Sequence, residues 1–296
     1  TGRLIEIEQN SLDMIVYFPG SVDLNRLKKN KSITMSSKGY EAPAILVWAS
    51  FNLENELFSD VRVRKAIAHA IDLNFVNKVL NSGYSQSLRG PIVPFSPFFV
   101  EDQIVDYDID LEKAAELLDA AGYPVGSDGK RMKVVVDFVP ASSAYKRTAE
   151  YFVGQLKKLK IDASVRVSPD LSTYANRLGK HEFDISIEGI VSWGDPVIGT
   201  HRNFLSSNIK PAWGTNIMSY RNEKVDQLLN DAGREMDPDK RKALYGEFQK
   251  IVTDELPVVF LYIPDYYTVT RDHVEDAPSS IWGPLSPWDN VHMKNT

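Results

Sequence analysis

The sequence predicts an α/β fold, and three observations lead to that prediction. The chain has 296 residues, of which 43% are hydrophobic and 25% charged, a composition typical of folded globular proteins. Between residues 132 and 190, segments with the composition of strands alternate with segments of helical periodicity. The connections between these segments are short. We therefore expect neighbouring strands joined by right-handed crossovers, in a mainly parallel mixed sheet flanked by helices.

Two short apolar runs begin the chain. Residues 12–18 (LDMIVYF) and 44–51 (AILVWASF) are rich in β-branched and aromatic side chains, which is typical of buried strands. A longer amphipathic pattern follows in residues 58–83, where apolar side chains recur at every fourth position: Val63, Ile67, Ile71, Phe75 and Val79. Ser59 or Asp60 can cap its start and Gly83 can close it, so this segment predicts one strong helix.

The middle of the chain alternates between loop, helix and strand. Residues 89–108 contain three prolines and several aromatic residues, so we expect an irregular loop there. Residues 108–124 predict a helix that Asp110 caps and Gly122 ends. The alternating run then comprises strand 132–139, helix 142–159, strand 161–168, a short helix 171–179 and strand 183–190.

The last third predicts two more helices and a final strand. Residues 222–233 have Asn222 as a cap, and residues 237–255 have Asp237 as a cap with Pro238 in the first helical position. A strand-like segment follows around Pro264. The remaining tail is rich in proline and tryptophan.

Charge and cysteine content exclude several classes of function. The net charge is −6, from 34 basic and 40 acidic residues, and no basic run is dense enough to track a phosphate backbone, so we expect no nucleic acid partner. There is no cysteine, which excludes disulfides, cysteine nucleophiles and thiolate metal sites. No apolar run approaches the ~20 residues that span a bilayer.

Motifs for catalysis, metals and cofactors are absent from the sequence. Residues 190–194 (IVSWG) lack the first glycine of a nucleophile elbow, because Ile190 stands there. The five histidines have no metal-ligand spacing, and no H-E-x-x-H or G-x-G-x-x-G motif occurs. Residues 126–131 (GSDGKR) lack the spacing of a phosphate loop and predict a polar hairpin. We therefore expect no enzyme, no metal and no cofactor.

Aromatic residues are numerous in predicted loops. The chain has 13 Tyr, 13 Phe and 5 Trp, and Trp193, Trp213, Trp282 and Trp288 all lie beside Gly or Pro. Rings placed in turns suit planar or extended ligands, because they provide a large contact area at small entropic cost. The alternative is that these rings fill gaps at the edges of the fold.

Three segments resemble one protein family. They are FSDVRVRKAIAHAID at 58–72, YDIDLEKAAELLDAAGY at 107–123 and YRNEKVDQLLNDA at 220–232. In type, order and approximate spacing they are similar to segments of the bacterial extracellular solute-binding proteins, family 5, the dipeptide, oligopeptide and nickel type that serve ATP-binding-cassette (ABC) importers. Two residues depart from the family pattern: Leu73 replaces a basic residue, and Lys160 replaces a glycine.

The resemblance implies a two-lobed fold of which this chain holds one lobe. The expected fold is a periplasmic-binding-protein-like lobe of the class II, cluster C type, with remnants of the other lobe. On this interpretation residues 51–255 form the second, C-terminal ligand-binding lobe. Residues 1–50 belong to the first lobe and a crossover strand, and residues 256–296 return to the first lobe through crossover strands and a tail.

The resemblance also implies a function. It is the capture of a peptide-like solute in a cleft between lobes and its delivery to the permease subunits of an ABC importer, with no covalent chemistry. The implied location is extracytoplasmic, in the periplasm or as a lipoprotein on the outer face of the membrane, with the signal or anchor segment outside this chain, and the implied state is a monomer. Two alternatives stay open: an oligosaccharide as ligand, and an α/β enzyme that uses Asp195 and His201 as an acid–base pair.

The segment VSWGDPVIG at 191–199 is the first candidate site. In peptide-binding relatives an aspartate soon after the corresponding strand pairs with the ligand ammonium, and Asp195 is the nearest acid here. Counting as in the relatives puts Trp193 at the place of that aspartate, so a ring replaces the carboxylate. Asp195 can instead form the turn before Pro196. Further candidate ligand contacts are His201, Arg202, Asn203, Trp213, Asn216 and Tyr220, with Trp48 and Asn52 near the first crossover.

Overall fold

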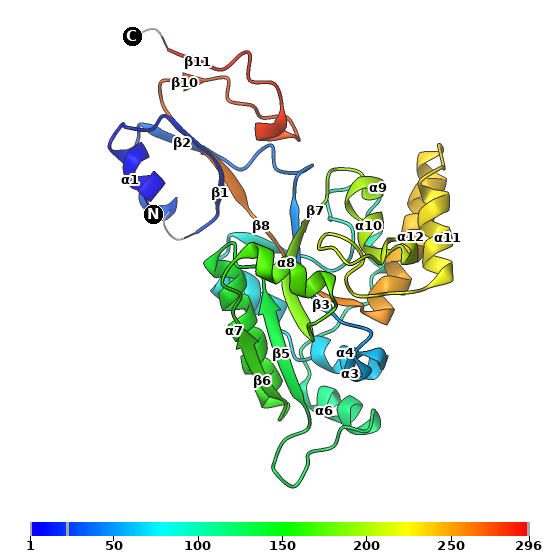
Figure 1. Cartoon of the computed structure of the whole chain (residues 1–296). Coiled ribbons are helices and arrows are strands. Elements are labelled where there is room, and N and C mark those ends of the chain that lie inside the picture. Colours follow the sequence, from blue (N-terminus) through cyan, green and yellow to red (C-terminus); the bar gives the residue numbers. More distant parts are fainter. Residues whose placement is uncertain (1, 22–23, 295–296) are drawn as a thin grey trace.

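The computed structural model describes residues 2–21 and 24–294, and it confirms the α/β class (Figure 1). A large helix-flanked sheet forms the main lobe. A smaller sheet and the C-terminal tail lie beyond one end of it, drawn in blue and in orange to red in Figure 1. None of the described helices is long and apolar enough to cross a membrane.

The large sheet is mixed. In the part of the chain that is described, its strand order is β4-β8-β3-β7-β5-β6. The bounds are β3 Ile45–Phe51, β4 Ser85–Ser87, β5 Lys133–Phe138, β6 Asp162–Arg166, β7 Ile185–Val191 and β8 Val258–Pro264. Strand β5 pairs in parallel with β6 and β7, whereas β3–β7, β3–β8 and β4–β8 are antiparallel.

The expectation of a mainly parallel sheet therefore holds only for β5, β6 and β7, the strands of the alternating run. The reason is the path of the chain between the two sheets. Strand β3 enters the lobe from the small sheet and β8 leaves toward it, so β3 runs against both β8 and β7. Periodicity predicts that each segment is a strand, but it carries no information about these long-range pairings.

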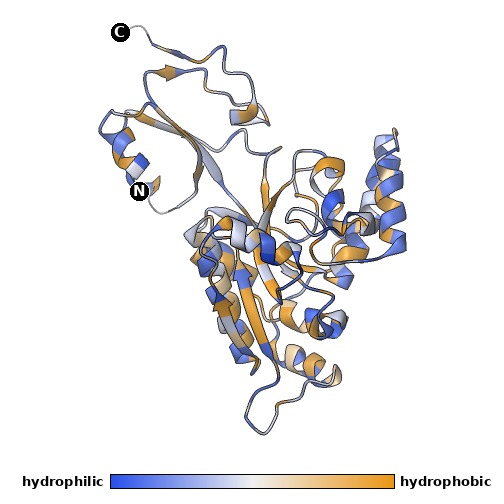
Figure 2. Cartoon of the chain, viewed as in Figure 1, coloured by the Kyte–Doolittle hydropathy of each residue, from blue (hydrophilic) through white to orange (hydrophobic). Residues whose placement is uncertain are grey.

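Helices cover both faces of the large sheet, which explains why its central strands β3, β5, β7 and β8 are mostly apolar. On one face lie α4 (Val61–Ala68), α6 (Leu111–Ala120) and α7 (Ser143–Lys158), and on the other α8 (Leu171–Gly179), α11 (Glu223–Ala232) and α12 (Pro238–Glu255). Successive residues of β3 alternate between the two cores, with Val47 and Ala49 in the first and Leu46 and Trp48 in the second. Figure 2 shows the same layering, with apolar strands inside and polar outer helix surfaces.

The helix predicted over residues 58–83 is wrong as a continuous element. The chain forms α3 (Glu56–Ser59), α4, α5 (Leu73–Phe75) and a π-helical turn at Val76–Leu80. Asp60 and Asp72 each accept a hydrogen bond from a backbone N–H and start a new helix. The apolar spacing continues across the break at Asp72, but Val79 beyond it is 57% exposed.

Most other predicted elements are confirmed. Helices α6, α11 and α12 have Asp110, Asn222 and Asp237 as their caps, as expected. The loop at 89–108 is irregular except for a 3-10 turn at Glu101–Gln103, and two further 3-10 turns lie at Ser206–Asn208 and Gly283–Leu285.

The small sheet is antiparallel. Its described strands are β1 (Met14–Pro19), β9 (Tyr266–Arg271) and β2 (Ile33–Ser36), packed with α1 (Gly2–Glu8) and α2 (Leu24–Leu27) around a separate apolar core. Only Asp265 separates β8 of the large sheet from β9 of the small one. The tail ends in a hairpin of β10 (Val274–Glu275) and β11 (His292–Met293).

Candidate functional site

The segment after β7 forms a tight turn whose first residue, Ser192, is bonded to the segment before β3. The Ser192 N–H donates to the Ala44 carbonyl at 2.9 Å, and the Ser192 hydroxyl donates to the Ala42 carbonyl at 2.8 Å. Two short helices follow, α9 (Pro196–Gly199) and α10 (His201–Phe204). A Cβ on Gly199 would lie 1.9 Å from the Ser192 carbonyl oxygen, so only glycine allows α9 to fold back against the turn.

Trp193 and Gly194 at the centre of this turn both have left-handed backbone angles. The φ of Trp193 is 55° and that of Gly194 is 74°. A bulky residue rarely adopts this conformation, and such outliers concentrate at functional sites. Trp193 is partly exposed and follows the carboxyl end of β7, the edge where α/β sheets commonly bind ligands.

The turn lies where the main lobe meets the crossover segment and the tail. A Cβ on Gly194 would lie 3.3 Å from the Ala42 side chain and 3.6 Å from the Trp282 ring. The Ala42 N–H donates to the Ile281 carbonyl at 2.9 Å. Several large apolar side chains of these segments are exposed: Val197, Ile198, Ile281 and Trp282. Trp282 is not among the predicted site residues, although its place beside Gly283 is the same signal that singled out Trp193.

An aromatic cluster lies on the crossover itself. The rings of Tyr17, Tyr40 and Tyr266 have centroids 5.3 to 6.1 Å apart, and the Tyr40 hydroxyl is 2.8 Å from that of Thr268. Tyr17 has a φ of 51°, a second strained aromatic residue. Burial raises the pKa of Tyr266 to about 12. The sequence analysis missed this cluster because its members come from three distant segments.

Asp195 has structural partners. Its carboxylate accepts the Val197 N–H at 2.9 Å and so caps α9. It also accepts two hydrogen bonds from the Arg241 guanidinium of α12, at 3.0 and 2.8 Å. The guanidinium lies over the Phe98 ring, 4.5 Å from its centroid. This arrangement favours the alternative in which Asp195 forms the turn.

The residues of α10 are buried or form hydrogen bonds with neighbouring turns and loops. His201 is buried, its Nε2 lies 2.9 Å from the Tyr245 hydroxyl, and burial lowers its pKa to about 4. The Asn203 side-chain amide donates to the Gly199 carbonyl at 2.9 Å. Arg202 is only partly exposed, and its backbone carbonyl accepts a hydrogen bond from Asn208. The structure thus brings Asp195 and His201 into one network through Arg241 and Tyr245, with Asp195 at its partly exposed end and His201 at its buried end.

Trp48 and Trp213 converge on a buried carboxylate that the sequence analysis missed. Glu188 of β7 accepts hydrogen bonds from the indole N–H of Trp48 at 3.2 Å, from that of Trp213 at 2.9 Å, and from the Ser50 hydroxyl at 2.5 Å. Burial raises the pKa of Glu188. The sequence does indicate this residue, because Glu188 is an acidic residue within the apolar strand predicted at 183–190. An acid in a strand that is covered on both faces needs hydrogen-bond partners.

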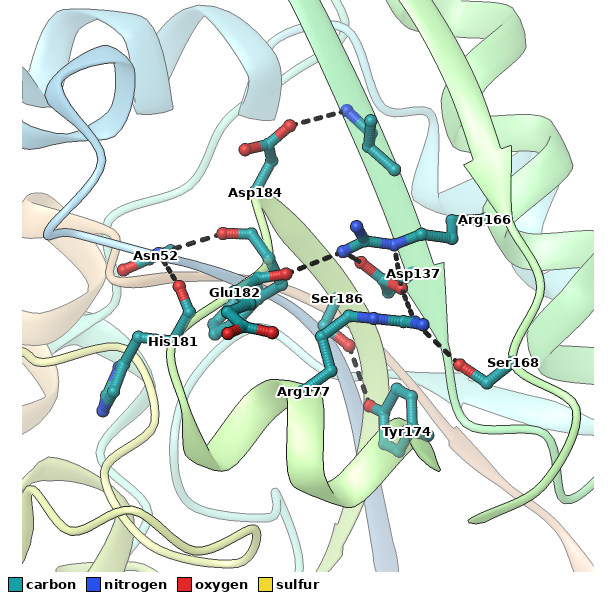
Figure 3. A network of polar contacts seen from close by, with 12 residues as sticks. Asn52, Asp137, Arg166, Ser168, Tyr174, Arg177, His181, Glu182, Asp184 and Ser186 are labelled. Carbon is teal, nitrogen blue, oxygen red and sulfur yellow. Dashed lines mark hydrogen bonds and ion pairs between the residues drawn. The ribbon is translucent and has the colours of Figure 1, made fainter. Parts of the chain in front are cut away.

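Asn52, Asn216 and Tyr220 are buried and act within the protein. The Asn52 amide donates to the His181 carbonyl at 2.8 Å and to that of Phe183 at 2.9 Å (Figure 3). The Asn216 amide donates to the Tyr220 carbonyl at 2.8 Å. The Tyr220 hydroxyl donates to Glu255 at 2.5 Å. These side chains fasten loops to the lobe.

A second unpredicted network centres on Asp137. Its carboxylate is fully buried and accepts hydrogen bonds from Arg166 at 2.9 and 2.6 Å and from Arg177 at 2.8 Å (Figure 3). Arg177 also donates to the Ser168 hydroxyl at 2.8 Å. Because Arg177 lies on α8 and Arg166 on β6, the network ties that helix to the sheet.

The fold defines a class of protein: a helix-flanked mixed sheet joined by crossing strands to a second sheet is the architecture of a periplasmic binding protein lobe. Residues 1–212 match the family described as bacterial extracellular solute-binding proteins, family 5 Middle, and the chain belongs to this family. The family comprises substrate-binding proteins rather than enzymes.

Similar proteins include carriers of different solutes. Heme-binding protein A of Haemophilus influenzae is 29% identical over 268 residues, which cover 87% of this chain and 45% of that protein. The dipeptide-binding protein of Escherichia coli is 25% identical over 92% of this chain and 50% of its own length. The structure of DppA from Helicobacter pylori in complex with the peptide STSA has a TM-score of 0.82 at 25% identity, over 99% of this chain and 55% of that one. The chain thus spans about half the length of the curated relatives it matches.

Proposed function

We propose that this chain is the C-terminal ligand-binding lobe of an extracytoplasmic solute-binding protein that captures peptide-like solutes for an ABC importer. The observation that carries the proposal is family membership together with likeness, over nearly the whole chain, to a dipeptide-binding protein and to a peptide complex. Residues 51–255 form the body of this lobe, and the crossover strands β3 and β8 complete its sheet. Residues 1–50 contribute to the first lobe and the crossover strand β3, and residues 256–296 return to the first lobe through β8 and the tail. The partner of the loaded protein is a membrane permease, and the protein acts as a monomer in the periplasm or as an anchored lipoprotein.

The mechanism is closure around the solute. A ligand that touches both lobes favours the closed form over the open one by its difference in affinity for the two. The abrupt passage from β8 to β9 at Asp265 and the segment before β3 are the connections about which the lobes move. Trp193 contributes a ring to the ligand surface, and the exposed Val197 and Ile198 extend it as an apolar wall.

A saccharide is the second candidate ligand, because a ring presented at the end of a strand suits stacking on a sugar face. The α/β enzyme has less support. Asp195 is paired with Arg241 and caps α9, and His201 is buried against Tyr245, so His201 is not accessible to a ligand as an acid–base group.

Mass spectrometry of the solute carried by the full-length protein tests the proposal. The protein is purified without added ligand and denatured, and the released solute is identified. Its melting temperature is then measured with panels of short peptides, oligosaccharides and haem. We expect a peptide in the released fraction and a rise in melting temperature with peptides alone. Release of a saccharide or haem, with no response to any peptide, contradicts the proposal.

A further inference from the structure

A cavity of about 350 Å³ lies on the outer side of the main lobe, beside the C-terminal half of α7. Helix α7 follows the carboxyl end of β5 and ends just before β6 begins. The cavity therefore lies toward the amino ends of these parallel strands, at the opposite edge of the sheet from the turn at residues 192–195. Its lining includes Asp72, Phe75, Tyr151, Gly154, Gln155 and Lys158.

Gln155 has a buried unpaired polar atom in the wall of this cavity. Its side chain is 4% exposed, and its amide nitrogen donates to the Tyr151 hydroxyl at 2.7 Å. Its Oε1 is buried and has no hydrogen-bond partner among the described residues. Turning the amide over changes which atom is unpaired but does not pair both. A buried polar atom of this kind is costly unless a partner reaches it.

Gly154 keeps the cavity open. It lies in the interior of α7, where glycine weakens a helix relative to alanine. A Cβ at this position would meet no atom within 4 Å, so packing does not require glycine here. Any larger side chain at this position would instead occupy cavity space.

The remaining lining combines both charges with an aromatic surface. Asp72 and Lys158 supply a carboxylate and an ammonium group to the same cavity. One Asp72 oxygen accepts the Phe75 N–H at 3.0 Å, and the Phe75 ring stacks on Tyr151 with centroids 5.0 Å apart. Phe75 is 38% exposed, so the ring offers apolar surface to a ligand.

We propose that this cavity is a second binding site, for a free amino acid with an apolar side chain. The ligand ammonium pairs with Asp72, the ligand carboxylate pairs with Lys158, and the ligand side chain packs on Phe75. The site is separate from the proposed peptide cleft and does not depend on it.

The test uses the 296-residue chain labelled with ¹⁵N-glycine, titrated with L-leucine and followed by heteronuclear NMR. The amide signal of Gly154 reports the cavity, and that of Gly194 reports the turn. We expect a saturable shift at Gly154 with Gly194 unmoved. The leucine analogues 3-methylbutylamine and 4-methylpentanoate, which lack the carboxylate and the ammonium respectively, should each bind at least about tenfold more weakly. Absence of a saturable shift, a shift at Gly194 alone, or binding of either analogue as tight as that of leucine overturns the proposal.

Variants test the same site by calorimetry. Gly154→Leu fills the cavity and should abolish leucine binding, whereas Glu150→Leu adds the same side chain one turn earlier on α7, outside the lining, and should not change it. Asp72→Asn keeps the helix cap, since asparagine caps as well as aspartate, and should weaken binding at least about tenfold. A circular dichroism spectrum that matches the wild-type spectrum shows that each variant is folded. Wild-type affinity in folded Gly154→Leu and Asp72→Asn overturns the site.

Discussion

Trp193 is the residue at which backbone strain and the proposed function meet. Its left-handed φ of 55° places the ring at the end of β7, and a β-carbon in that conformation costs about 1 kcal/mol. Trp193→Gly and Trp193→Ala both remove the ring, but only glycine adopts this φ freely. We expect Trp193→Gly to be about 1 kcal/mol more stable than Trp193→Ala in urea unfolding. Both should bind ligand less tightly in the full-length protein. Equal stability of the two variants would show that the backbone relaxes at this position.

His201 makes the stability of the fold depend on pH. Burial holds its pKa at about 4 in the folded state, below the 6.5 of the exposed side chain. The unfolded state therefore takes up the proton first. The stability of the fold is therefore unaffected by the titration of His201 above pH 6.5. As the pH falls from 6.5 toward 4, the free energy of unfolding decreases by up to about 3 kcal/mol.

To test this, the free energy of unfolding of the wild type and of His201→Gln is measured at several pH values between 7 and 4. The difference between the two proteins cancels titrating groups that are distant from His201. It should shrink or change sign as the pH falls. Parallel curves would show that the pKa of His201 is the same in the folded and unfolded states.

The sequence could identify residues whose role is local, and it could not identify those whose role depends on distant partners. Trp193 stands out because Gly194 and Pro196 mark its turn. Polar residues such as Asn52 and Asn216 look identical in sequence whether they bind a ligand or a loop carbonyl, and the structure gives both of them carbonyl partners. Glu188 could be found as an acid in a buried strand, but its indole donors come from separate segments.

At the scale of elements, the turn after β7 depends on the close contact between Gly199 and the Ser192 backbone. A Cβ on Gly199 would overlap a backbone oxygen, which cannot move aside as a flexible side chain can. We expect Gly199→Ala to lower the free energy of unfolding by about 2 kcal/mol. Gly154→Ala is the matched control, because nothing lies within 4 Å and helix propensity should raise stability by about 1 kcal/mol. Similar effects of the two substitutions would contradict this account of the turn.

Elements with their own caps were predictable, and their directions in the sheet were not. Helices α6, α11 and α12 begin where Asp110, Asn222 and Asp237 predict, because a cap is a local hydrogen bond. The helix over 58–83 failed for the same reason: Asp72 caps a new helix and overrides an apolar spacing that continues beyond it. The antiparallel pairing of β3 depends on β7 and β8, which lie more than 130 residues away along the chain.

At the scale of the molecule, two sheets share a chain that crosses between them. The large sheet has cores on both faces, and the small sheet has its own core around Leu4, Ile15 and Val269. The two parts can therefore keep their internal packing while their relative orientation changes, which is what closure around a solute requires. The turn with Trp193 lies at the junction, in contact with both the crossover segment and the tail.

The most direct test of the central claim is calorimetric titration of the full-length protein with peptides of two to five residues, alongside Trp193→Ala. We predict saturable binding of at least one peptide and a loss of about tenfold or more in affinity for Trp193→Ala, because the ring is part of the ligand surface. Unchanged affinity in the variant would contradict the placement of the site after β7. Binding of saccharides but of no peptide would contradict the proposed class of solute.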